Sequence, residues 1–209
     1  ILLGTQMVAK GLDFENVTLS AVLDADLSLY ASDYRAAETT FSLITQVVGR
    51  AGRGEQAGTA MVQTMTPEHP VIKLAARQDY DAFYEMEIAL RELHHCPPFL
   101  DLFFITFTGL YEDQVVQAAK RFRDNLRTQL KTPPYASHSA TLLGPAPCAV
   151  AKINYTYRYR LTLSCKNSRT LAAKNGKPLR QLLDSGLRAF AKEKQNRGVN
   201  AYADVNSYD

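Results

Sequence analysis

The sequence predicts an α/β protein in two parts, a parallel sheet with helices followed by a β-α-β-β-α-β unit. In the first half, apolar runs alternate with an amphipathic helical pattern, which is typical of parallel sheets. In the second half, runs and stripes follow the order strand, helix, strand, strand, helix, strand. The halves also differ in charge: residues 1–99 carry 7 Lys+Arg and 13 Asp+Glu, and residues 100–209 carry 17 and 8.

The first strand is predicted at residues 1–5, ILLGT, which read as a buried run. Because the chain opens on this run and not on Met, we expect it to be a piece of a longer protein. A second strand is predicted within residues 17–26, and this run ends in Asp24 and Asp26. Carboxylates often follow strands of parallel sheets where loops carry function. Asp24 and Asp26 are therefore a candidate carboxylate pair, although we favour a role in supporting the neighbouring loops.

A helix is predicted over about residues 36–50, because Phe41, Ile44, Val48 and Ala51 recur every three or four positions. A short strand starts after Gly58. Residues 66–72, TPEHPVI, predict a turn and a helix start with Pro67 near the first turn.

A further helix is predicted over residues 79–95 and must stop before Pro97 and Pro98, which restrict the backbone and lack an N–H. We therefore place a domain boundary here, with residues 1–98 in the first domain and 99–209 in the second. The His94-His95-Cys96 run is interpreted as a helix end and not as a metal site, since three consecutive helical residues point in three directions. No metal site is expected in this chain.

The second domain contains two predicted helices and four predicted strands, an order that indicates a ferredoxin-like fold. The helix stripes are Val115, Ala119, Phe122, Leu126 and Leu130, and Leu179, Leu182, Leu183, Leu187 and Phe190. The run NYTYRYRLTLSC alternates, which predicts a strand with Tyr155, Tyr157, Tyr159, Leu161 and Leu163 on one face and Arg158 and Arg160 on the other. The tyrosine row is expected to face the core, with base stacking as the alternative.

Composition restricts the protein classes. Hydrophobic residues make up 46% and charged residues 22% of the chain, as in ordinary globular proteins. No run approaches the ~18 apolar residues that a membrane helix needs. Three widely spaced cysteines without a CxxC argue against disulfides and zinc and favour a reducing cytoplasm. The basic second half suits nucleic acid or an acidic peptide; a solvated lysine-rich surface is the alternative.

The run QVVGRAGRG, residues 46–54, carries the strongest functional signal. If helical winding continues, Gln46, Arg50 and Arg53 share one face. A guanidinium matches phosphate oxygens, and an arginine finger contributes ~10³–10⁵ in rate. We therefore predict that Arg53, Arg50 and Gln46 act on a nucleotide γ-phosphate. The alternative is a helix end whose dipole the arginines neutralise.

These residues also resemble a known family. QVVGRAGRG is similar to the sixth motif of superfamily 2 helicases, and GTQMVAKGLDF, residues 4–14, to their fifth. With LDAD and PEHPVI, they resemble the C-terminal third of the PriA family of replication-restart helicases (primosomal protein N′). LGPAP before a basic strand supports the resemblance in the second half. The run DVNSYD departs from the Asp-Val-Asp-Pro ending common in that family.

The resemblance implies a partial RecA-like helicase lobe followed by a ferredoxin-like DNA- and partner-binding domain. It implies that Thr5 and Gln6 lie near DNA, and that Gly11 and Asp13 face ATP with Gln46, Arg50 and Arg53. Arg158 and Arg160 are further candidates for DNA contacts. Arg169 and Lys174 are candidates for an acidic peptide tail, with a solvated surface as the favoured alternative.

Two helicase features are missing from the sequence. There is no G-x-x-x-x-G-K-[ST], because Pro178 follows the only Gly-Lys pair, and there is no Asp-Glu-x-His. We therefore expect ATP with Mg²⁺ to be bound mainly by a lobe outside this chain, and this piece alone to lack ATPase activity. The resemblance places the family's zinc sites upstream.

The resulting hypothesis is part of an ATP-dependent 3′-to-5′ DNA helicase, a hydrolase that restarts stalled replication forks and reloads the primosome. Expected partners are forked and single-stranded DNA, the acidic tail of single-strand DNA-binding protein and primosome-loading proteins. The expected location is the bacterial cytoplasm, at the nucleoid. Alternatives are another superfamily 2 translocase, such as a RecG-like fork remodeller, and a nucleic-acid-binding module without catalysis.

Overall fold

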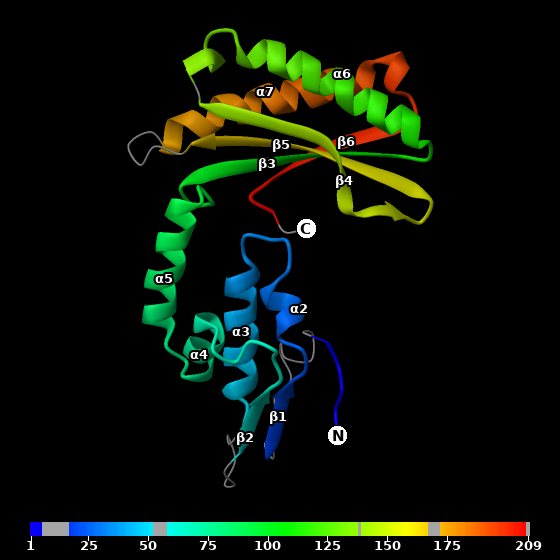
Figure 1. Ribbon diagram of the computed structural model, residues 1–209. Helices are drawn as coiled ribbons and strands as arrows, with labels where there is room; N and C mark the ends of the chain where they lie inside the picture. Colours follow the sequence, from blue (N-terminus) through cyan, green and yellow to red (C-terminus); the bar gives the residue numbers. More distant parts are fainter. Residues whose placement is uncertain (6–16, 52–57, 138, 167–171, 208–209) are drawn as a thin grey trace. The chain divides into compact units, whose positions relative to one another are not determined.

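The structure, a computed structural model, describes residues 1–5, 17–51, 58–137, 139–166 and 172–207. The chain divides into two compact units, Ile1–Leu90 (unit 1) and Arg91–Asp209 (unit 2). Unit 1 contains a parallel sheet and unit 2 an antiparallel sheet, each with helices (Figure 1). The predicted α/β class is confirmed.

Unit 1 is built on two parallel strands, β1 (Leu19–Val22) and β2 (Thr59–Val62), paired in register from Leu19↔Thr59 to Val22↔Val62. The connection between them contains α2 (Asp26–Leu29) and α3 (Ala36–Val48). The helices α4 (Pro70–Ala76) and α5 (Tyr80–Leu93) follow β2. The short helix α2 has no counterpart in the sequence prediction, because four residues cannot show a helical repeat.

The core of unit 1 lies between one face of this sheet and the helices. Phe41 and Ile44 of the predicted α3 stripe are buried, Val48 is only partly buried, and Ala51 lies beyond the helix end. Val47, which the prediction did not include, is buried as well. The Phe41 ring stacks on Phe83 of α5 with centroids 4.1 Å apart. Val22 of β1 joins this cluster, and Val62 of β2 packs against it while partly buried. The opposite face of the sheet exposes Leu19 and Met61, each at 57%.

The prediction of a buried strand at residues 1–5 is wrong. These residues have no strand conformation, and Ile1, Leu2 and Leu3 are all exposed. A buried strand needs paired neighbours and cover on both faces, and the described sheet of unit 1 offers only β1 and β2. The prediction relied on apolar composition alone, which does not show whether a strand has a partner and cover.

The ends of α4 and α5 follow capping chemistry. α4 begins at Pro70, with His69 as N-cap accepting a hydrogen bond from the Val71 N–H, so Pro67 lies before the first turn and not in it. At the end of α5, His95 has φ 52°, its N–H donates to the Glu92 carbonyl, and the Cys96 N–H donates to the Arg91 carbonyl. This is a Schellman end with histidine where glycine is usual, which explains the His94-His95-Cys96 run.

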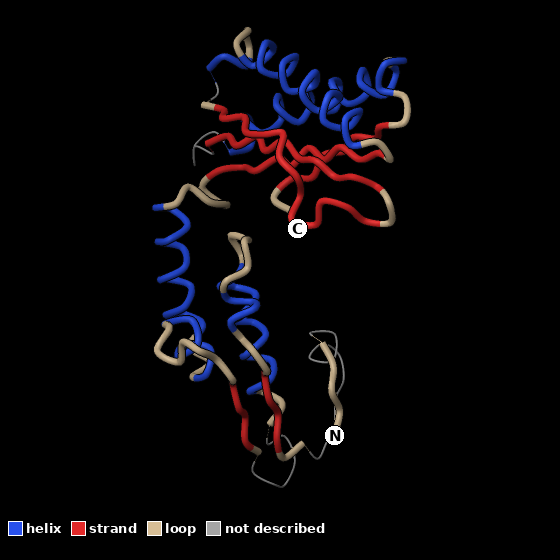
Figure 2. The backbone as a smooth tube through the Cα atoms, turned by 45° about the vertical axis from the view of Figure 1, so that its right-hand side comes forward, coloured by secondary structure: helices blue, strands red, loops and turns tan. Residues whose placement is uncertain are grey.

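Unit 2 has the predicted order of elements. These are β3 (Leu100–Gly109), α6 (Glu112–Leu130), β4 (Ala140–Ile153), β5 (Thr156–Lys166), α7 (Ala172–Lys192) and β6 (Val199–Val205), with short 3-10 turns at Tyr135–Ser137 and Lys194–Asn196. The strands form one antiparallel sheet in the order β4-β5-β3-β6. Figures 1 and 2 show α6 and α7 side by side on one face of this sheet.

The core of unit 2 lies between the sheet and these two helices. Both predicted helix stripes are confirmed, with Leu130 and Leu187 only partly buried. From the strands, Phe103, Ile105, Phe107, Leu161 and Leu163 are fully buried. Phe107 contacts Phe122 and Phe190 edge-on, each with ring centroids 5.5 Å apart.

The β4–β5 hairpin differs from its prediction in two respects. The run ATLLGPAP predicts a strand that ends at the Gly144-Pro145 corner, but β4 continues past register shifts at this corner and between Pro147 and Lys152. The tyrosine row also divides: Tyr159 packs on the core, whereas Tyr155 occupies the hairpin turn and is 82% exposed. Alternation cannot continue through Tyr155, because a turn breaks the period of a strand.

Candidate nucleotide and nucleic-acid sites

Two residues of the predicted nucleotide site, Gln46 and Arg50, lie at the C-terminal end of α3. The helix ends at Val48, two residues before the predicted end, and Gly49 is its C-cap. The N–H groups of Arg50 and Ala51 then donate to carbonyls three residues back, so the winding tightens. Gln46 and Arg50 are both half-buried, and the Gln46 amide donates to Ser42 Oγ at 2.9 Å.

A serine of β1 anchors this end of α3. Ser20 Oγ donates to the Val47 carbonyl at 2.9 Å. The same carbonyl accepts the Arg50 N–H at 3.2 Å, so the bond from Ser20 ties the end of the helix to the sheet. The sequence gives no signal for it beyond a hydroxyl in a strand.

Several predicted site residues lie outside the described residues. These are Gln6, Gly11, Asp13, Arg53 and Arg169. Lys174 lies within α7, and Thr5 is exposed. The structure therefore brings together only Gln46 and Arg50 of the nucleotide set, at one helix end.

Asp26 connects the loops that follow the two parallel strands. Its carboxylate accepts hydrogen bonds from Thr66 Oγ1 at 2.9 Å, Thr64 Oγ1 at 3.1 Å and the Met65 N–H at 2.7 Å. The Met65 N–H, ahead of the two hydroxyls, holds the pKa of Asp26 below its usual value of 3.8, and partial desolvation opposes this. Asp26 thus supports a loop, the role that the sequence favoured over a carboxylate pair.

The face of the unit 2 sheet opposite α6 and α7 carries the two predicted DNA-contact arginines. We call this surface the open face and define it by Phe104, Arg158, Arg160 and Tyr202, with Thr106 buried between Arg160 and Tyr202. The register places Arg160 opposite Thr106, and Thr106 opposite Tyr202 on the next strand. Of the helices that the structure describes in unit 2, none lies over this face (Figures 1 and 2).

Contacts within the open face hold the arginines in place. The Arg160 guanidinium lies over the Phe104 ring, 4.9 Å from its centroid, and Arg158 Nη1 donates to the Val150 carbonyl at 3.4 Å. Both arginines are half-buried, and Tyr202 is 42% exposed. A cation stacked on an aromatic ring and a second cation nearby suit a phosphate backbone.

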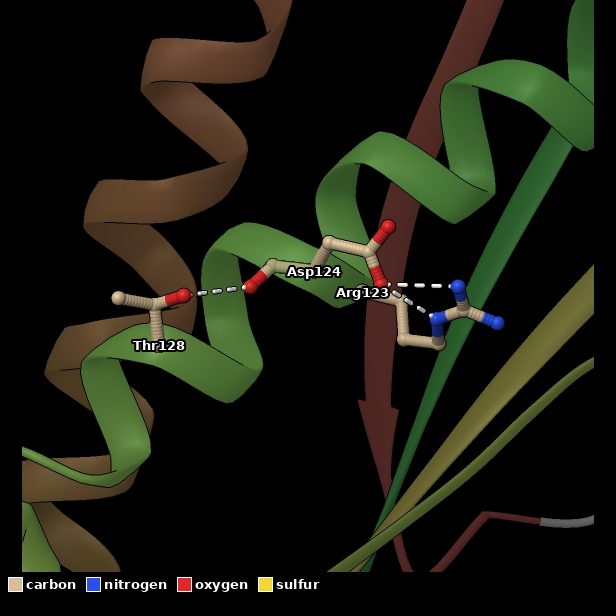
Figure 3. Close-up of polar contacts among 3 residues, drawn as sticks. All are labelled: Arg123, Asp124 and Thr128. Atoms are coloured by element: carbon tan, nitrogen blue, oxygen red, sulfur yellow. Dashed lines mark hydrogen bonds and ion pairs between the residues drawn. The ribbon is translucent and has the colours of Figure 1, made fainter.

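The helix layer of unit 2 is also basic, but two of its arginines are paired with neighbouring carboxylates. Figure 3 shows Arg123 bound to Asp124 on α6, with Nε and Nη2 each 2.8 Å from Oδ1, while Thr128 Oγ1 donates to the Asp124 carbonyl. On α7, Arg188 pairs with Asp184 one turn earlier. The helix layer therefore offers less unbalanced positive charge than its arginine count indicates.

Comparison with known proteins identifies the family. Residues 92–205 match the family model described as the primosomal protein N C-terminal domain. The chain is also 39% identical over 208 residues to the replication restart protein PriA of Bacillus subtilis (strain 168), an alignment covering 100% of this chain and 24% of the relative. The chain belongs to the PriA family.

Other PriA proteins agree with this assignment. The Chlamydia pneumoniae protein is 42% identical over 163 residues, which cover 78% of this chain and 21% of that protein. The Chlamydia muridarum protein is 36% identical over 205 residues, covering 98% and 25%. The chain thus spans about a quarter of the length of the curated PriA relatives it matches. The matched C-terminal domain contains every residue of the open face.

Sequence reasoning missed Phe104 and Tyr202 as members of this surface. Their strands were predicted, but only the sheet order, with β3 between β5 and β6, brings both beside Arg160. Among the described residues, no group of three or more His, Cys, Asp or Glu side chains is placed to bind a metal ion. Across the same ranges, every helix is too short or too polar to span a bilayer.

Proposed function

We propose that this chain is part of an ATP-dependent 3′-to-5′ DNA helicase that restarts stalled replication forks and reloads the primosome, and that unit 2 holds the DNA on its open face. The observation that carries the proposal is the position of Arg158 and Arg160 on a sheet face left uncovered by α6 and α7, in a chain of the PriA family. Phosphate contacts of this kind give affinity without reading sequence, as a protein acting at any stalled fork requires.

In this proposal, unit 1 is the back of a RecA-like lobe. Its parallel sheet exposes Leu19 and Met61 on the face away from α3, and parallel sheets are ordinarily covered on both faces. This exposure favours a larger sheet completed by the remaining three quarters of a protein of the relatives' length. Unit 2 is classed as ferredoxin-like from its element order and its sheet order.

ATP with Mg²⁺ is bound mainly by the other lobe and supplies the energy of translocation when hydrolysed. Gln46, Arg50 and Arg53 reach its phosphates, and Gly11 and Asp13 lie near the nucleotide. The half-buried Arg50 and Gln46 fit this ligand chemically, because both present N–H donors at one helix end. Thr5 and Gln6 contact the DNA strand along which the lobe moves.

The partners in this proposal are forked and single-stranded DNA, primosome-loading proteins and the acidic tail of single-strand DNA-binding protein, with Arg169 and Lys174 as contacts for the tail. The site of action is the nucleoid in the bacterial cytoplasm. The 209-residue chain alone is a nucleic-acid-binding module without ATPase activity. Unit 2, with its own core and the open face, supports this second function for the isolated chain.

The DNA-binding claim is tested by a matched pair of double variants in the 209-residue chain. Arg158→Gln/Arg160→Gln removes two charges from the open face, and Lys120→Gln/Arg127→Gln removes two from the helix layer. Binding to forked DNA is measured by fluorescence anisotropy at several salt concentrations. The open-face variant should lower the slope of log K against log salt by about 1.4–1.8, whereas the helix-layer variant should leave it nearly unchanged. Equal slopes for both variants would refute the assignment of the open face.

The nucleotide claim is tested in a protein of the relatives' full length. Arg53→Ala should lower ATP hydrolysis by ~10³–10⁵ while retaining part of the ATP binding. Arg50→Lys, which keeps the charge and loses the planar fork, should also reduce the rate. A normal kcat in Arg53→Ala would remove the finger role and leave the DNA-binding claim intact.

A further inference from the structure

We propose that the turn of the β4–β5 hairpin is a stacking site for an unpaired nucleic-acid base, with the Tyr155 ring as the stacking surface and Arg158 as a phosphate contact. The proposal rests on the proposed function, because it extends the open face to the end of the hairpin. It adds a ligand class, the single strand, that phosphate contacts alone do not specify.

The conformation of the turn presents the Tyr155 ring to solvent. Asn154 and Tyr155 form a two-residue loop between Ile153 and Thr156, with φ 46° and 63°. Positive φ at both positions defines a type I′ turn, whose second position favours glycine. A tyrosine at this position is conformationally strained. Because its side chain is 82% exposed, packing offsets little of that strain. Fold stability therefore does not account for a tyrosine at this position.

The surroundings of Tyr155 combine apolar surface with positive charge. Val150 and Ile153 are 54% and 45% exposed. Lys152 Nζ donates to Tyr157 Oη at 3.2 Å and lies 4.3 Å from the centre of that ring. Its position opposite Tyr157 puts it on the other face of the hairpin from Arg158, so it adds positive charge near the turn without belonging to the open face. Arg158, on the neighbouring strand, donates to the Val150 carbonyl.

The charge of this part of the chain favours a polyanion. Between Asp124 and Asp184 the sequence contains ten Lys and Arg residues and no Asp or Glu. Both strands of the hairpin, residues 140–166, fall within this stretch. Two acidic residues lie beside β5: Glu112 accepts a hydrogen bond from Tyr159 Oη at 2.6 Å, and Asp101 lies opposite Cys165, four and ten residues beyond Tyr155.

The hairpin end and the open face lie on the same side of the sheet. Figures 1 and 2 show the end of the hairpin bending away from α6 and α7. Arg158 belongs to the open face and also reaches Val150 next to the turn, so it links the two surfaces. A backbone held by Arg160 and Arg158 can continue to the turn, where its base meets the Tyr155 ring.

The ring selects an unpaired strand and not a duplex. A base offers its face for stacking only when it is not already stacked inside a double helix. The arginines contact phosphates of either form. The site thus predicts that Tyr155 contributes to single-strand binding and little to duplex binding.

The test compares variants of the 209-residue chain by fluorescence anisotropy, on a single-stranded oligonucleotide and on the duplex of the same sequence. Tyr155→Gly removes the ring and suits the positive φ of the turn, so the variant should fold. It should weaken single-strand binding by roughly 5- to 150-fold, with duplex binding and the salt slope nearly unchanged. Tyr155→Phe should bind like the unmodified chain. Tyr84→Ala, which removes an exposed tyrosine of α5, is the matched control and should change neither affinity.

A second readout reports stacking directly. An oligonucleotide carrying 2-aminopurine should lose fluorescence when the unmodified chain or Tyr155→Phe binds, and should keep it with Tyr155→Gly at saturation. Unchanged single-strand affinity in Tyr155→Gly, together with weaker binding in Arg158→Gln/Arg160→Gln, would overturn the stacking site and leave the proposed function standing. If the unmodified chain bound neither oligonucleotide, the proposed function itself would fail. Stronger binding to a polyglutamate peptide, lost in Tyr155→Gly, would make the hairpin a peptide site and overturn the proposal.

Discussion

The two sheets of this chain use their uncovered faces differently. The parallel sheet of unit 1 exposes Leu19 and Met61 on the face away from α3, whereas the antiparallel sheet of unit 2 presents Arg160 and Tyr202 on the face away from its helices. An antiparallel sheet can face water on one side, but a parallel sheet is normally buried on both. Unit 2 therefore leaves free the face on which we propose nucleic-acid contacts, whereas unit 1 leaves apolar residues of a parallel sheet exposed.

This comparison predicts the largest mutational effects in unit 2. Phe107→Ala removes a fully buried ring that contacts Phe122 and Phe190. It should cost about 3–5 kcal/mol in the free energy of unfolding of unit 2. Met61→Ala, on the exposed face of unit 1, should change stability by less than about 0.5 kcal/mol in the isolated chain. Urea denaturation followed by hydrogen exchange in each unit measures both, and comparable losses would contradict the difference between the units.

Two glycines of unit 2 sharpen the claim that its core is closely packed. A Cβ on Gly109 would lie 2.9 Å from the Gly198 carbonyl oxygen and from Val115 Cγ2, so Gly109→Ala should destabilise the unit by about 1–3 kcal/mol. A Cβ on Gly186, in α7, would touch the Phe122 ring at 3.5 Å. Gly186→Ala should therefore gain up to about 1 kcal/mol through helix propensity. Thermal unfolding distinguishes them, and equal shifts of Tm in one direction would contradict the packing described.

The smallest predicted effect is a pH dependence in unit 1. The Met65 N–H and the Thr66 and Thr64 hydroxyls lower the pKa of Asp26, so the carboxylate stabilises the folded loop. This stabilisation is present above the usual, unfolded pKa of 3.8 and is lost as pH falls through the lower pKa of the folded state. Asp26→Asn should remove the dependence and speed exchange of the Met65 amide. Asp24→Asn, at a positive φ that asparagine tolerates, should do neither.

The sequence predicts elements well where a periodic pattern is buried on one side. The stripes of α3, α6 and α7 and the alternation of Leu161 and Leu163 each faced a core, so pattern and structure agree. The prediction failed at residues 1–5, because apolar composition does not show whether a neighbouring strand is present to pair with them. It also failed at Tyr155, where a turn interrupted the alternation.

The candidate sites are less accessible to sequence reasoning. Arg158 and Arg160 could be assigned to one strand face, but Phe104 and Tyr202 join them only through long-range strand pairing. The Asp26 contacts span about forty residues and depend on the parallel pairing of β1 and β2. The local sequence pattern does not reveal such contacts, because each residue alone is an ordinary strand or loop residue.

The open face as the nucleic-acid interface is tested most directly by hydrogen exchange of the 209-residue chain with and without forked DNA. A single strand bound there should slow exchange in β5 around Arg158 and Arg160, in β3 and at the β4–β5 turn, and leave the outer residues of α6 and α7 unchanged. Protection confined to α6 and α7, with β5 exchanging at the same rate in both states, would contradict the account.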